Sequence, residues 1–318
     1  MKHYSSLTGV SLNKCILTIG SFDGVHLGHR ELLTTVVKSS NSENADSAVI
    51  TFNPIPFVYF RKIFEPYNLL DKSNKSKLLE SLGIDHLITL TFDKQLSSLK
   101  PEAFIEFVLQ HICINKLIIG YDFTLGKDKT GSFSVLNNIG TAKGFEVIVI
   151  PPLKVNGNIV SSSLIRKTLK SGNVKQAGKY LGRGYSIGGI VVSGDGRGKQ
   201  VGFPTANIDY NKTRLLPKNG VYVTLAKING RSYPSVTNIG LRPTFANQLN
   251  IPRIETYILD FDKNLYDKYI TIEFIDFIRE EVKFSSIKEL KLQIDKDVLF
   301  TNKALSDVIK TKNIPSRS

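Results

Sequence analysis

The feature that most limits how this chain can fold is the alternation of short apolar runs with amphipathic segments in its first half. Segments with apolar side chains at helical spacing separate the runs. Strands that alternate with helices form a parallel sheet with helices on both faces. We therefore expect an α/β domain that binds ligands beyond the carboxyl ends of its strands. The expected strands are 14–22, 47–52, 85–92, 115–120 and 145–150, and the expected helices are 29–40, 74–83 and 101–112.

The pattern changes near residue 183, where short alternating runs separated by Gly, Asn and Pro turns begin. Such spacing is typical of an antiparallel β-barrel or sandwich. The sequence thus predicts two domains, 1–183 and 184–318. The expected strands of the second domain are 188–194, 220–228, 231–240, 253–261 and 268–278.

A helix is expected to close the second domain. Ser286 and Glu289 have the spacing of a capping box, in which the hydroxyl accepts from a first-turn amide and the glutamate reaches back. The residues expected to form its buried stripe are Ile287, Leu290, Ile294 and Val298.

Composition excludes several classes of protein. With 41% hydrophobic and 22% charged residues, the 318-residue chain is globular rather than disordered. No apolar run approaches the roughly 18 residues of a membrane span. Cys15 and Cys113 lie in apolar runs without metal-ligand spacing, which predicts reduced core thiols in a cytoplasmic protein. The net charge of +14 is spread over both halves, which favours nucleotides over a nucleic-acid partner, and the lack of a long apolar run predicts no membrane partner.

The strongest local pattern is Gly20-Ser-Phe-Asp-Gly-Val-His26-Leu-Gly28-His29, between an expected strand and an expected helix. It matches neither a Rossmann fingerprint nor a Walker A loop. Amides at a helix N-terminus bind phosphate, and histidines three residues apart share one helix face. The pattern therefore predicts a phosphate site in which His26 and His29 stabilise charge that develops on phosphorus.

Two further stretches offer groups that bind phosphate or metal. Serines 161–163 and Arg166 stand at an expected helix start, where hydroxyls and a guanidinium can hold phosphate. Thr205 and Asn207 are two apart on an extended segment, so their oxygens point to the same side and suit magnesium. Taken alone, either stretch also suits an ordinary cap or turn. Glu255 alternates with apolar neighbours in an expected strand.

These stretches resemble one family. GSFDGVHLGHRELL is similar to the nucleotidylyltransferase signature, and residues 14–300 resemble the prokaryotic bifunctional riboflavin kinase/FAD synthetases in order. The resemblance implies a Rossmann-like nucleotidylyltransferase domain followed by a β-barrel riboflavin kinase domain. In the first domain it assigns catalysis to His26 and His29. Its implied nucleotide- and flavin-binding residues there are Gly20, Phe22, Asp23, Gly24, Gly28, Gly120, Asp122, Phe123, Gly126, Ser162, Ser163 and Arg166.

In the second domain the resemblance implies that Glu255 is the general base of the kinase and that Thr205 and Asn207 hold the magnesium of MgATP. The expected reactions are phosphorylation of riboflavin to FMN and adenylylation of FMN to FAD, so ATP, riboflavin and FMN are the expected partners. The residues implied to bind MgATP here are Gly196, Gly198, Lys199, Gly202, Pro204, Thr205 and Asn207.

The chain departs from the family pattern after its second expected strand. Asn53 and Ile55 stand where the family usually has aspartate and histidine, while the hydroxyl at Ser163 keeps the chemistry of the usual threonine. Two alternatives stay open. One is a nucleotidylyltransferase for another acceptor with a noncatalytic barrel, and the other is a basic nucleic-acid-binding or flavin-sensing module.

Overall fold

A computed structural model shows the fold and describes residues 1–194, 198, 202–241 and 252–312, with side chains to residue 306. The chain divides into two compact units, Met1–Ser162 and Ser163–Ser318, and each is described by itself. This division precedes the expected boundary at 183. The helix α8 (Val174–Leu181) packs on strands of the second unit, and Lys218 N–H donates to Leu169 O of α7 (Ser162–Lys170) at 3.0 Å.

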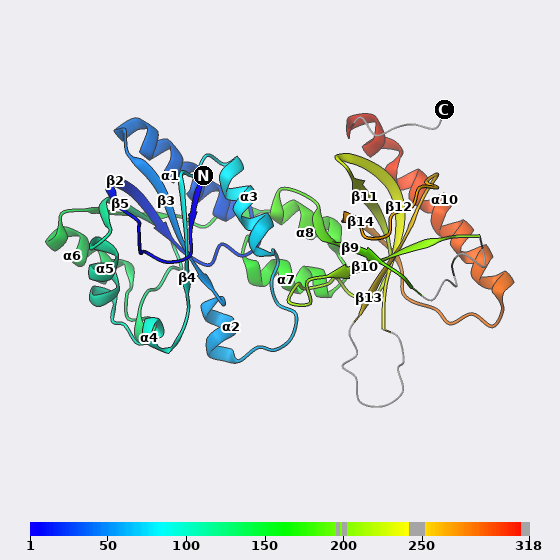
Figure 1. Ribbon diagram of the computed structural model, residues 1–318, viewed down its shortest axis with the longest axis horizontal. Coiled ribbons are helices and arrows are strands. Elements are labelled where there is room, and N and C mark those ends of the chain that lie inside the picture. The colour runs from blue at the N-terminus through cyan, green and yellow to red at the C-terminus, as the bar shows by residue number, and fades with distance from the viewer. Residues whose placement is uncertain (195–197, 199–201, 242–251, 313–318) are drawn as a thin grey trace. The chain divides into compact units, whose positions relative to one another are not determined.

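The first unit is built on a six-stranded parallel sheet with the strand order β1-β4-β3-β2-β5-β6 (Figure 1). The predicted strands and helices are present, with ends that differ by a few residues. The strands are β1 (Lys2–Tyr4), β2 (Leu12–Ile19), β3 (Asp46–Asn53), β4 (His86–Thr91), β5 (Ile112–Gly120) and β6 (Glu146–Ile150). The helices are α1 (Leu27–Glu43), α2 (Pro56–Arg61), α3 (Lys72–Ser81), α4 (Lys94–Ser97), α5 (Pro101–Leu109) and α6 (Phe133–Lys143).

Alternate residues of each strand enter different apolar clusters, which is why helices cover both faces of the sheet. Ile16 of β2 packs in a cluster with Leu33 of α1 and Leu79 of α3. Its neighbour Leu17 packs in a second cluster with Ile105 of α5 and Leu136 of α6. The predicted doubly covered α/β architecture is confirmed.

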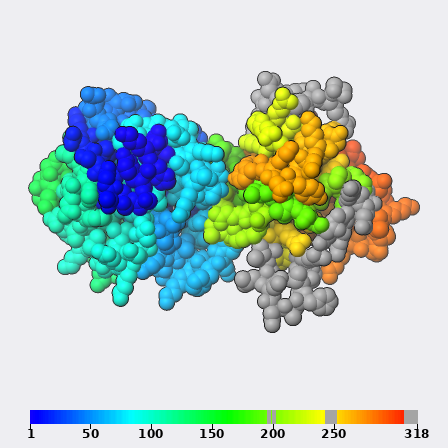
Figure 2. Space-filling model, viewed as in Figure 1, coloured from blue at the N-terminus to red at the C-terminus, as the bar shows by residue number. Residues whose placement is uncertain are grey.

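The order of the strands creates a switch point beside β2. From β2 the chain moves to β3 and then β4, and it returns to pair β5 with the other side of β2. In open α/β sheets the crevice for ligands opens at such a point, beyond the carboxyl ends of the strands. The loops that follow β2 and β5 therefore flank the expected ligand position. The short edge strand β1 lies on the surface of this unit, where Figure 2 shows the N-terminal residues in dark blue.

The second unit contains a closed antiparallel barrel of six strands, which resolves the choice between barrel and sandwich. The strands expected at 220–228 and 231–240 have those bounds. A small two-stranded sheet, β7 (Lys154–Val155) with β8 (Asn158–Ile159), belongs to the first unit. The barrel strands are β9 (Tyr185–Val192), β10 (Thr205–Tyr210), β11 (Gly220–Ile228), β12 (Arg231–Gly240), β13 (Arg253–Ile258) and β14 (Tyr269–Arg279).

One face of the barrel wall is fully buried and carries a chain of hydroxyl groups. Thr224 Oγ1 lies 2.8 Å from Ser235 Oγ and 2.7 Å from Thr237 Oγ1, which in turn lies 2.9 Å from Thr256 Oγ1. Each hydroxyl can donate one hydrogen bond and accept others, so these four groups provide hydrogen-bond partners for one another without water. Because side chains alternate along a strand, Glu255 faces away from Thr256 and its buried neighbours.

The C-terminal helix α10 (Ile287–Lys312) begins with the predicted cap but buries a different stripe. Ser286 Oγ accepts from Glu289 N–H at 3.2 Å, whereas the Glu289 carboxylate accepts from Ser285 N–H at 3.1 Å. The prediction that Ile287 is buried was wrong, since 67% of it is exposed. Leu290, Ile294 and Val298 are half-buried, and among the residues of α10 up to 306 the buried positions are Asp297, Thr301 and Leu305.

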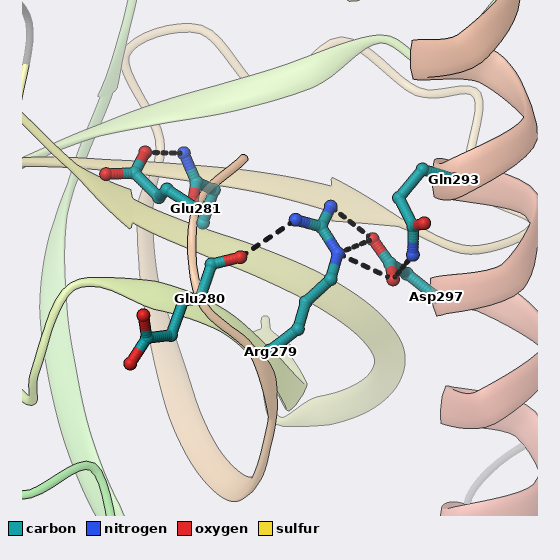
Figure 3. A network of polar contacts seen from close by, with 6 residues as sticks. Arg279, Glu280, Glu281, Gln293 and Asp297 are labelled. Carbon is teal, nitrogen blue, oxygen red and sulfur yellow. Dashed lines mark hydrogen bonds and ion pairs between the residues drawn. The ribbon is translucent and has the colours of Figure 1, made fainter. Parts of the chain in front are cut away.

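A charged pair explains this rotation of α10 (Figure 3). Arg279 at the end of β14 donates to Asp297 through Nε at 3.0 Å and Nη2 at 2.7 Å, a fork against both carboxylate oxygens. Gln293 Nε2 donates to Asp297 Oδ1 at 3.0 Å. The side chain of Asp297 is only 3% exposed. The face of α10 that packs against the barrel therefore includes a charged residue and is not a continuous apolar stripe.

The cysteines only partly follow the expectation of two core thiols. Both are free; Cys15 is buried, and burial raises the pKa of its thiol, with Asp46 and Asp85 adding to the shift. Cys113 is exposed because it alternates outward along β5. Within the described part of the chain, no helix combines the length and the apolar character needed to cross a membrane.

Candidate active sites

The glycine-rich turn after β2 brings both predicted histidines to the N-terminus of α1. His26 is the N-cap of this helix, and its Nδ1 accepts from His29 N–H at 3.2 Å. The two imidazole rings stack with centroids 3.6 Å apart. Two imidazoles and the first amides of a 17-residue helix therefore meet at the carboxyl end of β2, and such an arrangement can bind a phosphate group.

Phe22 and the glycines around it support this pair. Phe22 is 2% exposed, and its ring meets His29 edge-on with centroids 5.2 Å apart. A Cβ on Gly20 would lie 3.1 Å from the Phe22 ring, and one on Gly28 would lie 3.3 Å from His26 Cε1. The geometry thus gives Phe22 a packing role beneath His29, and the two glycines leave room for the aromatic rings.

Asp23 is turned into the protein. Only 1% of the residue is exposed, and its carboxylate accepts hydrogen bonds from Leu69 N–H at 3.0 Å and Leu70 N–H at 3.2 Å. Its carbonyl accepts from Ser162 Oγ at 2.7 Å. Asp23 and Ser162, both predicted to contact the nucleotide, are therefore joined to each other and hold the turn in place. Gly24 adopts φ of 87°, which suits glycine.

The loop after β5 lies across the switch point from the histidine turn. Gly120 ends the strand, Phe123 N–H donates to its carbonyl at 3.1 Å, and Asp122 is exposed. Phe123 is half-buried against the core. Gly126 has φ of 78°, and a Cβ there would lie 2.8 Å from Pro101. The requirement for glycine at 126 is therefore explained by its positive φ and by packing against Pro101.

Helix α7 carries the remaining predicted phosphate ligands of the first domain. Ser163 is exposed and Arg166 is buried in its first turns. The expected helix start at the serine cluster is confirmed by the start of α7 at Ser162. The phosphate-binding roles of Ser163 and Arg166 stay predictions.

The barrel brings Thr205, Asn207 and Glu255 to one face of two neighbouring strands. In the antiparallel register of β10 and β13, Asn207 pairs directly with Glu255 and Thr205 with Tyr257. Directly opposed residues have Cβ atoms about 4.5–5.5 Å apart and point to the same side. All three polar side chains are half-buried. A carboxylate thus stands beside the two expected magnesium ligands.

Two glycines lie directly against these ligands. A Cβ on Gly194 would lie 2.0 Å from Asn207 Nδ2, and one on Gly198 would lie 3.2 Å from Thr205 Oγ1. Gly194 and Gly198 therefore lie close against the two side chains. Gly202 and Pro204 are exposed in the same loop, whereas the predicted ligands Gly196 and Lys199 lie outside the described residues.

Aromatic rings border this face of the barrel. Phe203 meets Tyr257 edge-on with centroids 5.2 Å apart. Burial raises the pKa of Tyr257, and the charges of Asp260 and Asp295 raise it further. Its hydroxyl therefore stays protonated at neutral pH and is available as a neutral hydrogen-bonding group.

The described residues contain no cluster of three or more His, Cys, Asp or Glu side chains that could hold a metal ion by themselves. A hydroxyl, an amide oxygen and a carboxylate suit a different arrangement. Magnesium commonly uses one or two protein oxygens together with substrate phosphates and water. The set of Thr205, Asn207 and Glu255, with Gly194 and Gly198 close beside the first two, fits a metal that arrives with a nucleotide.

The sequence analysis missed a set of exposed aromatic residues that begins just after β3, at the same edge of the sheet as the histidine turn. Phe57, Phe60 and Phe64 are 49%, 61% and 94% exposed. Phe57 stacks on Tyr67 with centroids 5.5 Å apart, and Phe60 meets Phe92 edge-on at 5.6 Å. The sequence does show this set, because five of the eleven residues from 57 to 67 are aromatic. None of these eleven residues is buried in the structure.

Comparisons with known proteins agree for both units. A model of the FAD synthetase family matches residues 10–164, and a model of the riboflavin kinase family matches residues 181–305. Curated proteins named bifunctional riboflavin kinase/FMN adenylyltransferase are similar over most of the chain. The Bacillus subtilis protein is 36% identical over 89% of this chain and 90% of its own length. The Escherichia coli K12 protein is 34% identical over 90% of this chain and 91% of its own length.

A solved structure extends the likeness to three dimensions. A crystal structure described as a macrolide-efflux protein from Streptococcus pneumoniae superimposes with a TM-score of 0.84 at 30% identity. The match covers 95% of this chain and 98% of that chain.

Proposed function

Because the chain belongs to the family of bifunctional riboflavin kinase/FMN adenylyltransferases, we propose how its described residues carry out the two reactions of that family. The enzyme phosphorylates riboflavin with ATP, which gives FMN and ADP. It then transfers AMP from a second ATP to FMN, which gives FAD and pyrophosphate. The proposal assigns the second reaction to residues 1–183 and the first to residues 184–318.

In the proposed adenylyl transfer, the FMN phosphate attacks the α-phosphorus of ATP directly. The bond to the pyrophosphate oxygen breaks as the new phosphorus–oxygen bond forms, so no covalent enzyme intermediate is needed. His26, His29 and the first amides of α1 bind the phosphates of ATP and stabilise the charge that builds during this exchange. Alignment of the two reactants supplies much of the remaining rate enhancement.

The proposed flavin position in the first domain is the aromatic segment that carries Phe57, Phe60, Phe64 and Tyr67. Exposed aromatic rings favour a flat apolar ligand, because stacking removes both surfaces from water. The aromatic segment follows β3, whose last residue is Asn53, and Ile55 is the N-cap of α2. The segment in which the family's aspartate and histidine are replaced therefore leads directly into this aromatic surface.

In the proposed kinase reaction, Glu255 accepts the proton of the terminal ribityl hydroxyl as that oxygen attacks the γ-phosphorus of ATP. Thr205 and Asn207 would hold Mg²⁺, which neutralises phosphate charge when it is bound. The observation that carries this assignment is the direct pairing of Asn207 with Glu255, because it sets the base beside the nucleotide ligands. The proposal also includes a cytoplasmic location, where free thiols such as Cys15 and Cys113 stay reduced.

The test uses purified enzyme with riboflavin and MgATP, and chromatography separates the flavin products. His29→Ala should lower FAD formation about 10²–10³-fold, because one group that stabilises the transition state is lost, while FMN accumulates. Glu255→Gln should lower FMN formation about 10²–10⁴-fold while FAD still forms from added FMN. Each variant is the folding control for the other reaction. Equal loss of both reactions in either variant would contradict the division of labour.

A further inference from the structure

The buried lysine of α3 is not explained by the reactions described above. Lys75 is 9% exposed, and its Nζ donates to Ser21 O at 2.7 Å. Ser21 stands in the turn that leads to His26. Lys75 Nζ also lies 3.5 Å from Thr51 Oγ1, which itself donates to Ser21 O at 3.2 Å. One backbone carbonyl of the turn is therefore held from two elements at once, α3 and β3.

The turn to which Lys75 donates has a strained backbone conformation. Phe22 and Val25 have φ of 45° and 39°, in the left-handed region that bulky and β-branched residues rarely adopt. Residues held in such regions are strained and persist only where the surrounding structure fixes them. The turn therefore needs contacts with other elements that hold it in this conformation.

Two side chains of opposite charge, Asp23 and Lys75, hold the turn against the start of α3. Asp23 extends from the turn, and its carboxylate accepts hydrogen bonds from the amides of Leu69 and Leu70, just before α3. Lys75 extends from α3 and donates back to the carbonyl of Ser21. The turn and the start of α3 are thus fastened in both directions, and the segments are far apart in sequence.

The electrostatics of Lys75 agree with this geometry. Burial lowers the pKa of Lys75, Lys72 on the same helix lowers it further, and the Asp23 carboxylate raises it. Burying a charged group is costly unless it is paired and hydrogen-bonded. The hydrogen bond to the Ser21 carbonyl and the opposite charge of Asp23 offset part of this cost.

We propose that Lys75 is a positioning residue for adenylyl transfer, which fixes the turn so that His26 and His29 meet the phosphates of ATP. His26 Nδ1 caps the helix and the two rings stack, so a shift of the turn moves both imidazoles together. A displacement of about 1 Å caused by a distant change can lower a rate about 10²-fold. The inference rests on the proposed role of His26 and His29.

The test compares Lys75→Met, which keeps the bulk of the side chain but removes its charge and its donor, with Lys77→Met at an exposed position of the same helix. Lys75→Met should lower kcat for FAD formation from FMN about 10–10²-fold and leave the KM for FMN unchanged. FMN formation by the same preparation should stay at the wild-type rate. Hydrogen exchange of the amides at 20–25 should become faster. Lys77→Met should behave like the wild type.

A second variant keeps the proposal falsifiable if Lys75→Met does not fold. Thr51→Val has nearly the same volume and removes only the second donor to Ser21 O, so it should lower the same kcat several-fold in a folded enzyme. A kcat within about twofold of the wild type for a folded Lys75→Met, or for Thr51→Val if Lys75→Met unfolds, overturns the proposal. If His29→Ala leaves FAD formation intact, the proposed function fails instead, and the two failures are distinguishable.

Discussion

Two glycines determine how closely the backbone approaches the proposed magnesium ligands of the barrel. Gly194 lies so close to Asn207 that a Cβ would fall 2.0 Å from Nδ2. Gly194→Ala must therefore push the Asn207 side chain away from its partner Glu255. We expect a several-fold higher KM for MgATP in FMN formation, measured with riboflavin in excess, and no change in FAD formation from FMN.

The matched control for that substitution is Gly230→Ala, in the turn between β11 and β12. Gly230 has φ of 80°, but nothing lies within 4 Å of its Cβ position, so the change introduces only backbone strain of about 1 kcal/mol. It should lower stability without altering the KM for MgATP. An unchanged KM in Gly194→Ala would show that Asn207 does not bind the metal-nucleotide complex.

Single residues also show where prediction from sequence stops. His26 and His29 could be found because a local pattern of strand, glycines and helix start makes a phosphate site. Lys75 could not be found, because its partner Ser21 is 54 positions away and only the packed sheet brings them together. The aromatic residues near Phe60 were visible in the sequence, but their exposure depends on how α2 leaves the sheet.

At the scale of elements, α10 depends on the pair Arg279–Asp297. Removing one partner of a buried ion pair leaves the other charge without compensation, which typically costs about 3–5 kcal/mol. Asp297→Ala should therefore lower the urea midpoint of the barrel clearly, because Arg279 and Gln293 both lose their acceptor. Asp295→Ala, exposed on the same helix, should leave the midpoint near the wild-type value. Equal midpoints for the two variants would mean that the pair does not fasten α10.

The same helix shows which features of an element are local. Its start at Ser286 was predictable, because capping depends on residues three positions apart. The buried face was not, because it follows from Arg279 at the end of another strand. Alternation in β13 was predictable for a similar reason, since Ile254, Thr256 and Ile258 are buried on one side of a pleated strand. Closure into a barrel needed pairings between strands that are distant in sequence.

At the scale of the whole molecule, each unit completes its own sheet and its own apolar core. We therefore expect the two reactions to be joined by FMN that diffuses through solution. A mixture of His29→Ala and Glu255→Gln chains should form FAD from riboflavin after a lag in which FMN accumulates. Either variant alone is the control and should form almost no FAD from riboflavin. Failure of the mixture, with FMN accumulating to the same level, would indicate that FMN must stay with one chain.

The division into an α/β half and a barrel half could be predicted, because hydrophobic periodicity changes along the chain and needs no knowledge of contacts. The resemblance to the riboflavin kinase/FAD synthetases added the activities, since neither apolar pattern specifies a substrate. The order of the strands could not be read from the sequence. It decides that the loops after β2 and β5 lie at neighbouring strand ends, where open α/β sheets bind their ligands.

Neighbouring strands of the barrel pair over different lengths. Among the described residues, β10 joins β13 through only Thr205–Tyr257, Ala206–Thr256 and Asn207–Glu255, whereas β11 and β12 stay paired along their full lengths. The proposed nucleotide ligands therefore sit on the shortest seam. A nucleotide that contacts both β10 and β13 links the two strands. Because it binds only the folded barrel, the free energy of unfolding rises with the nucleotide concentration.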